Sequence, residues 1–200
     1  MTTRSQLARL AARSIATVGA VLLALCVGSP PAMQSAATVN ASGSTLARNV
    51  VVPLTLVNRF FPEVTQEAST RQNSTATGDP TATRSVVYAA EDGAKKVTIS
   101  VDQYRTTRGA RSAYRQAVRN SKVPGFNPVR VPNVGQQTFA GTVTIGGETH
   151  IGLGTLDGKL IVGATLAGYN ATPDHTAKLV ALARAENAAA KAALAHANPP

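Results

Sequence analysis

Histidine and carboxylate side chains could perform acid–base or metal chemistry, and this sequence has few of them. The three histidines, His150, His175 and His196, are far apart and form no HxH, HExxH or HxxxH pair. Metal centres and catalytic triads need such groups to converge. The ten acidic residues contain no pair spaced as a glycosidase dyad and no calcium loop. The sequence therefore predicts no catalytic residue, no metal site and no cofactor, and it favours a protein that is not an enzyme.

A glycine-rich stretch, Gly152–Gly158, superficially resembles a nucleotide-binding loop. It lacks the G-x-G-x-x-G spacing and leads into an expected strand where that motif needs a helix. We expect Gly152, Gly154 and Gly163, called here the glycine patch, to cluster on the outer face of a sheet. Two interpretations stay open. Either a helix or loop packs closely on the patch, or the patch forms a shallow groove for an apolar ligand or a partner.

Four arginines recur at helical spacing in the middle of the chain: Arg108, Arg111, Arg115 and Arg119, called here the arginine surface. One interpretation is an ordinary solvated helix face. The other is attraction to an anionic envelope component, such as anionic lipid or a phosphate-bearing wall polymer, or to an acidic protein partner. Nucleic acid is not expected, since the tyrosines are not interleaved with basic residues as stacking platforms.

The N-terminus has the features of a secretory signal. Arg4, Arg9 and Arg13 precede an uncharged segment of about 14 residues, which is too short to span a bilayer comfortably. The small residues Ser35-Ala36-Ala37 favour cleavage after residue 37. We expect residues 1–37 to be a signal peptide, 38–45 a flexible linker and 46–198 a single domain, which is exported and lies outside the cell or in its envelope.

Cys26 leaves alternatives at this N-terminus. Leu23-Ala24-Leu25-Cys26 resembles a bacterial lipobox, in which the cysteine carries a lipid anchor. Simple cleavage and an uncleaved anchor are the other possibilities. Contact with a membrane is expected only through the signal segment or a lipid on Cys26.

The composition narrows the class of protein further. The chain has 200 residues, 44% of them hydrophobic, which is too many for a disordered protein. One cysteine excludes a disulfide framework. Of the 20 basic residues, three lie in the signal segment. The remainder of the chain then has 17 basic and ten acidic residues, which gives it a net charge of about +7.

Hydrophobic patterning predicts the elements before the middle of the chain. A short helix follows Pro53 and ends at Pro62, and the polar residues 65–83 indicate a long surface loop. Strands are expected over 85–90 and 95–104. A helix over 107–122 would begin at a Thr106 or Thr107 cap. Residues 126–137 indicate an edge strand or an ordered loop.

A hairpin meander is predicted over about 137–167. We expect a two-residue loop at Asp157-Gly158, with Ile151 and Leu153 on the core face. At Gly146 we expect a three-residue loop or a bulge, because a two-residue loop would place Val143 opposite His150 on the outer face. An Ala-rich C-terminal helix would start at Thr172. These elements predict an α+β fold with an antiparallel sheet and helices packed on one face.

Three segments carry a resemblance: VTISVDQYRTTRGARSAYRQAV, VPNVGQQTFAG and THIGLGTLDGKLIVGATLAGY. Together with the last helix they resemble small exported actinobacterial proteins, namely lipoproteins and extracellular sensor-type domains of mycobacteria and their relatives. The resemblance covers about residues 84–195. It implies an α+β domain that binds a ligand or partner without catalytic residues. This chain lacks the disulfide cysteines of the kinase sensor domains in that group.

The function expected from the sequence is that of a non-catalytic binding or sensor-like module at the bacterial cell envelope, recognising a lipid, a wall component or a protein. The alternative is a secreted interaction or structural protein with no small-molecule site.

Overall fold

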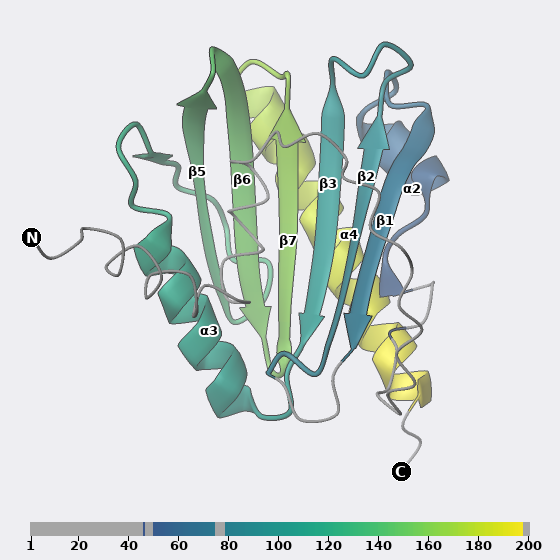
Figure 1. The fold of residues 1–200 in the computed structure, drawn as a ribbon, viewed down its shortest axis with the longest axis vertical. Helices are drawn as coiled ribbons and strands as arrows, with labels where there is room; N and C mark the ends of the chain where they lie inside the picture. The colour runs from purple at the N-terminus through teal and green to yellow at the C-terminus, as the bar shows by residue number, and fades with distance from the viewer. Residues whose placement is uncertain (1–45, 47–49, 75–78, 198–200) are drawn as a thin grey trace, which may run out of the picture.

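The computed structural model describes Leu46, residues 50–74 and residues 79–197. They form a seven-stranded antiparallel sheet in the order β1-β2-β3-β7-β6-β5-β4 (Figure 1). The strands are β1 (Gln66–Ser74), β2 (Ala82–Ala89), β3 (Lys96–Gln103), β4 (Asn127–Pro128), β5 (Gln137–Ile145), β6 (Glu148–Asp157) and β7 (Leu160–Ala167). The helices are α2 (Leu54–Phe60), α3 (Thr107–Asn120) and α4 (Pro173–Ala197). The α+β class, the antiparallel meander and the C-terminal helix are confirmed. The predicted signal peptide, Cys26 and the linker lie outside the described residues.

One face of the sheet, called here the inner face, carries the main core. Leu153 of β6 pairs with Ala164 of β7, and both side chains point toward α4. From α4, Leu179 and Leu182 pack into this core. Helix α2 contributes the buried Val57 to the same cluster. The inner face is therefore covered by α2 and α4.

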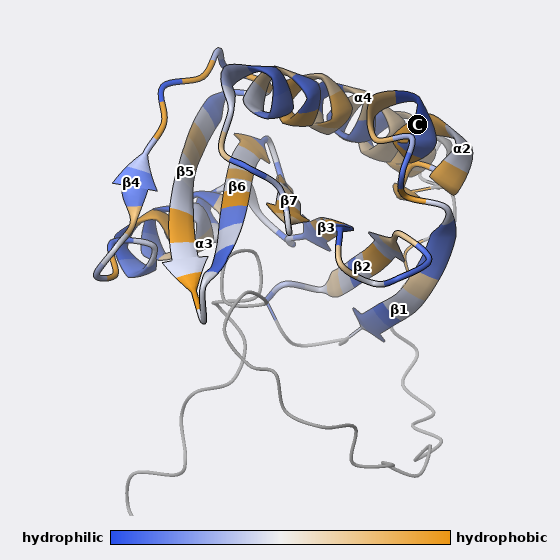
Figure 2. Cartoon of the chain, turned by 90° about the horizontal axis from the view of Figure 1, so that it is seen from above, coloured by the Kyte–Doolittle hydropathy of each residue, from blue (hydrophilic) through white to orange (hydrophobic). Residues whose placement is uncertain are grey.

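Helix α3 packs on the opposite face, called here the outer face, which corrects the expectation that the helices share one face. Leu156 pairs with Ile161, and both side chains point away from α4, because successive strand residues alternate between faces. They form a second, smaller cluster with Ala110 and Tyr114 of α3. Figure 2 shows α4 and α2 on one side of the sheet and α3 on the other.

The hairpin between β6 and β7 differs from its predicted register by two residues. Asp157 pairs with Leu160, so the two loop residues are Gly158, with φ of +63°, and Lys159. A shift of two residues preserves the side-chain faces, because the strand period is two. Ile151 and Leu153 therefore lie on the core face as predicted, although the loop itself was placed one residue too early.

The predicted three-residue loop or bulge between β5 and β6 is wrong. Ile145 pairs with Glu148 and Val143 with His150, which makes Gly146-Gly147 a two-residue loop. Both glycines have positive φ, +59° and +86°, as a type I′ hairpin turn requires. The prediction assumed that apolar residues on the outer face would lie in solvent. Part of this face is instead covered: Tyr114 of α3 packs edge-on against Phe139 of β5, with 5.6 Å between ring centroids.

The polar stretch predicted as a surface loop over 65–83 contains β1 and the start of β2. Eight of the nine residues of β1 are exposed, so the strand has no hydrophobic alternation for a sequence argument to detect. It is an edge strand, and its backbone pairs with β2 along its length except for an irregularity between Glu67 and Ser69. Polar edge strands of this kind limit unwanted pairing with other chains.

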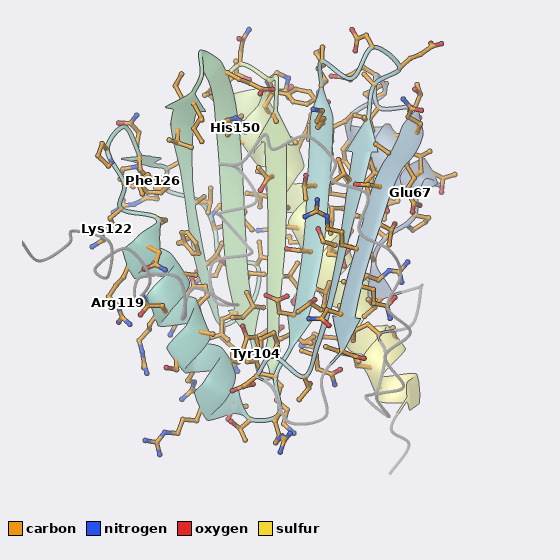
Figure 3. All side chains as sticks on the ribbon, in the orientation of Figure 1. Glu67, Tyr104, Arg119, Lys122, Phe126 and His150 are labelled. Atoms are coloured by element: carbon orange, nitrogen blue, oxygen red, sulfur yellow. The ribbon has the colours of Figure 1, made fainter. Side chains whose placement is uncertain are left out.

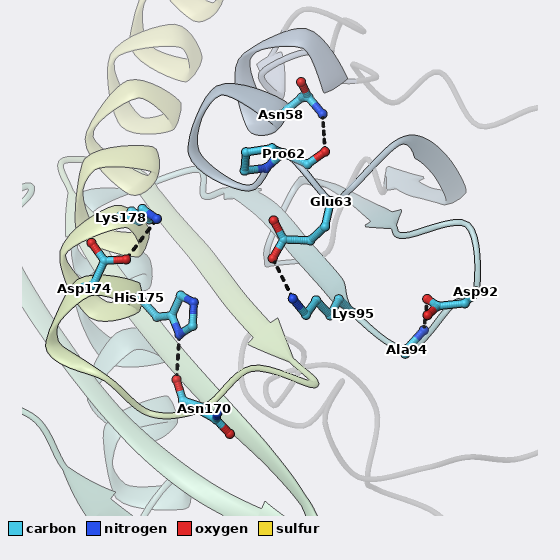
Figure 4. Close-up of polar contacts among 10 residues, drawn as sticks. All are labelled: Asn58, Pro62, Glu63, Asp92, Ala94, Lys95, Asn170, Asp174, His175 and Lys178. Atoms are coloured by element: carbon cyan, nitrogen blue, oxygen red, sulfur yellow. Dashed lines mark hydrogen bonds and ion pairs between the residues drawn. The ribbon is translucent and has the colours of Figure 1, made fainter.

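Local contacts fix the ends of the helices and loops. Thr106 caps α3 by accepting a hydrogen bond from Gly109 N at 3.0 Å. The Glu63–Lys95 ion pair, at 3.1 Å, ties the segment after α2 to the start of β3 (Figure 4). Within the described part of the chain, no helix has the length and apolar content needed to span a membrane.

Candidate binding surfaces

The arginine surface lies on the side of α3 that points away from the sheet. Since an α-helix advances 100° per residue, the four arginines fall within a sector of about 80° and span about 17 Å along the axis. The opposite side of α3 is anchored by the buried residues Ala110, Tyr114 and Ala117. Packing of this stripe on the outer face therefore fixes the direction in which the guanidinium groups point.

The four arginines are exposed. The ion pairs of the described residues join lysines or His150 to carboxylates, and none involves the arginine surface. Arg119 donates a hydrogen bond to Gln116 at 2.6 Å, which leaves its charge uncompensated. Figure 3 shows Arg119 on the side of α3 that points away from the sheet and Lys122 just beyond the end of the helix. The structure thus displays a band of positive charge on a well-anchored helix.

The glycine patch lies on the outer face, in the two strands next to α3. Gly154 pairs directly with Gly163, and Gly152 pairs with Thr165 of β7. A Cβ atom at Gly154 would lie 2.6 Å from the Phe139 ring, so this aromatic ring occupies the space above it. The neighbouring Gly141 is covered in the same way by Phe126. Side chains of the protein itself therefore fill part of the space above these glycines, which is the close packing that one of the two interpretations expected.

A carboxylate is buried at the edge of the same face. Asp102 of β3 is 6% exposed and lies opposite Ile161, next to the cluster beneath α3. Burial raises the pKa of Asp102 to about 7. Burial also raises the pKa of Tyr104, and the negative charges of Asp102 and Asp79 raise it further. No feature of the sequence indicated that Asp102 would be buried.

The histidines do not converge on a site. His150 is 7% exposed; its Nε2 lies 3.7 Å from a Glu148 oxygen, while its Nδ1 has no hydrogen-bond partner among the described residues. Burial lowers the pKa of His150, with Glu148 opposing and Lys96 adding to the effect. His175 Nδ1 lies 2.8 Å from the Asn170 carbonyl (Figure 4). No group of metal-ligating side chains occurs within the described ranges.

Two charged residues in the core were not singled out by the sequence. Arg84 of β2 is 9% exposed and Glu186 of α4 is fully buried. Each occupies a position in an otherwise apolar series: Arg84 alternates with Ala82 and Val86, and Glu186 follows Leu179 at helical spacing. A charged residue at a core-facing position is unusual, and this pattern could have identified both residues in the sequence.

These elements define an α+β protein whose antiparallel sheet has helices on both faces. No protein-family model matches the chain, and no curated protein matches it. Among solved structures, the chain is similar to the crystal structure of the extracellular domain of PknH from Mycobacterium tuberculosis, with a TM-score of 0.54 and 12% identity. The match covers 73% of this chain and 99% of that domain. At this identity the likeness shows the fold, which agrees with the expected resemblance to mycobacterial extracellular domains.

Proposed function

We propose that this chain is a non-catalytic, exported binding module of the cell envelope that contacts an anionic lipid surface through α3. Two observations support export and a sensor-like role: the secretory features of residues 1–37 and the shared fold with a mycobacterial extracellular domain. They concern the location and general type of the protein. The choice of partner depends on the charge of α3.

The arginine surface is the observation that carries this proposal. Four exposed guanidinium groups lie along one side of a helix whose other side is fixed in the fold. Near an anionic membrane each basic residue contributes about 1 kcal/mol, so several acting together give useful affinity without a pocket. Phosphate groups also match the fork of donors on arginine.

A second candidate function is a secreted interaction or structural protein with no small-molecule site. It is favoured by the rings of Phe139 and Phe126, which fill space above Gly154 and Gly141 on the outer face. In this case the remaining surface would contact another protein. The two candidates differ in whether lipid charge alone is sufficient for binding.

Vesicle binding tests the proposal. The protein is mixed with vesicles of phosphatidylcholine alone, or with vesicles of phosphatidylcholine that contain 30% phosphatidylglycerol, and the bound protein is measured by sedimentation. The buffer contains about 0.1 M salt, because lower salt exaggerates the effects of surface charge. We expect binding only to the anionic vesicles. The variant R111Q/R115Q should bind about 30-fold more weakly, because about 2 kcal/mol of attraction is removed.

The matched control is R59Q/R130Q, which removes the same charge from two exposed arginines outside α3. It should bind nearly as well as the wild type if the arginine surface is the contact. Equal weakening of both double variants would show that only net charge matters and would contradict the assignment to α3. Absence of binding to anionic vesicles would favour the second candidate.

A further inference from the structure

A pocket of about 510 Å³ lies on the inner face, near the exposed edge of the sheet. Its walls come from the segment before α2, from the start of α2, and from β1, β2 and α4. They are largely apolar and include Val51, Val52, Leu54, Val86, Tyr88 and Ala189. This volume is within the range of small-molecule sites. The pocket lies across the sheet from the arginine surface, so it is independent of the proposed membrane contact.

The charged residue inside this pocket is Arg84. Arg84 is 9% exposed, and it lines the pocket. Its Nη1 donates a hydrogen bond to Gln72 Oε1 at 2.7 Å, whereas its Nε has no partner in the described part of the chain. No ion pair among the described residues involves Arg84. Within the described residues the hydrogen-bond partner of this guanidinium is a neutral amide, and burying a positive charge without an anion beside it is costly.

The pocket wall is held in place by two hydrogen bonds to the backbone of Val52. Tyr88 donates its hydroxyl to Val52 O at 2.5 Å, and Glu186 Oε2 accepts from Val52 N at 2.8 Å. These contacts fix the segment before α2 against the sheet and α4. The cavity is therefore a defined part of the fold, with largely apolar walls and a buried guanidinium that forms no ion pair within the described residues.

We propose that this pocket binds a single-chain amphiphile with a carboxylate head group, the head lying at Arg84 and the chain against the apolar wall. One guanidinium matches one negative charge. A phosphate monoester carries about −1.5 to −2 at neutral pH, which would leave surplus negative charge in the pocket. Glu67 also lines the pocket, on exposed β1, where it accepts a hydrogen bond from Thr70. Its carboxylate forms no ion pair with Arg84, so it leaves the guanidinium free for a head group, and it disfavours a doubly charged head group more than a singly charged one.

The experiment is calorimetric titration of the full chain with four probes that share a ten-carbon chain: decanoate, decyl phosphate, decanol and decyltrimethylammonium. We expect decanoate to bind most tightly. The variant R84M should weaken decanoate binding about 10- to 100-fold and leave decanol binding unchanged, because it removes the charge and keeps an apolar side chain of similar length.

Two variants complete the test. R71M removes an exposed arginine of β1 and should bind decanoate as the wild type does. A189L narrows the pocket from α4 and should weaken decanoate and decanol alike. Because R84M removes an unpaired buried charge, it should unfold at the same temperature as the wild type or a higher one.

Three results would overturn the proposal: equal binding of decanoate to R84M and wild type, binding of decanol or decyl phosphate as tight as that of decanoate, or no binding of any probe. If R84M does not fold, the comparison of head groups on the wild type and the A189L result still decide the matter. None of these outcomes depends on the vesicle experiment, so failure of this proposal is separable from failure of the proposed function.

Discussion

The buried carboxyl of Glu186 predicts an unusual dependence of stability on pH. Its Oε2 accepts the hydrogen bond from Val52 N, and its Oε1 has no partner in the described part of the chain. Burial raises the pKa of Glu186 from 4.5 to about 8, with the Val52 hydrogen bond opposing the shift. The folded protein therefore keeps this proton at pH values where the unfolded chain has released it.

The sign and size of the effect follow from this difference. Between about pH 4.5 and pH 8 the folded state holds one more proton at Glu186 than the unfolded state, so stability falls as pH rises and levels off above pH 8. At 1.36 kcal/mol per pH unit, a pKa that rises from 4.5 to about 8 corresponds to a loss of stability of as much as about 5 kcal/mol. The loss is complete only above the raised pKa.

Glu186→Gln isolates this contribution, because glutamine keeps the acceptor for Val52 N and carries no charge. One extra unpaired N–H costs about 1 kcal/mol, so the variant should be slightly less stable than the wild type at pH 5. At pH 9 it should be more stable by about 4 kcal/mol, once the charged wild-type carboxylate is disfavoured. Urea unfolding, measured at intervals from pH 4.5 to 9, gives both curves.

The two curves should cross between pH 5 and pH 8, since the wild type alone loses stability through Glu186 in that interval. Parallel curves, with a constant difference between variant and wild type, would refute the argument. They would show that Glu186 has the same pKa in the folded and unfolded states. The remaining pH dependence, common to both proteins, reports the other buried groups.

Two further predictions concern the outer face and a loop. The wild type should lose stability between about pH 4 and pH 7, because the raised pKa of about 7 makes Asp102 retain its proton in the folded state over that range. Asp102→Asn should remove this loss, and urea unfolding at a series of pH values measures the difference in the free energy of unfolding. Gly168→Ala should lower the free energy of unfolding by at least about 2 kcal/mol, since alanine is disfavoured at a φ of +77° and its Cβ would overlap the carbonyl oxygen of Ala94. Gly125→Ala is the control, with a similar φ of +83° and open space, and should cost only about 1 kcal/mol; equal losses would contradict the steric argument.

Much of the fold could be predicted because its elements carry local signals. The alternation in β6 and β7 places Leu153 and Ala164 on the core face, and this survives a register error of two residues. Strand β1 could not be predicted, because an exposed edge strand has no apolar face. The predicted length of the loop at Gly146 was wrong for a related reason. The packing of α3 on the outer face is a tertiary feature, and local sequence patterns do not contain it.

The candidate sites also differ in whether local sequence signals could predict them. The arginine surface is visible in the sequence because its spacing matches one helix, and the structure places it on the exposed side of α3. The pocket at Arg84 is assembled from segments more than 100 residues apart, Val52 and Ala189 among them. A single charged residue at a core-facing position of a strand indicates that its charge is buried. Only the assembled pocket shows which kind of ligand could neutralise that charge.

Hydrogen exchange on the full chain, with and without anionic vesicles, tests the central claim most directly because it locates the contact. We expect slower exchange in residues 107–120, which form α3, with vesicles containing phosphatidylglycerol and no change with phosphatidylcholine alone. Residues 173–197, which form α4 on the opposite face, should exchange at the same rate in both cases. Protection of α4, or no protection of α3 when the protein is bound, would contradict the account.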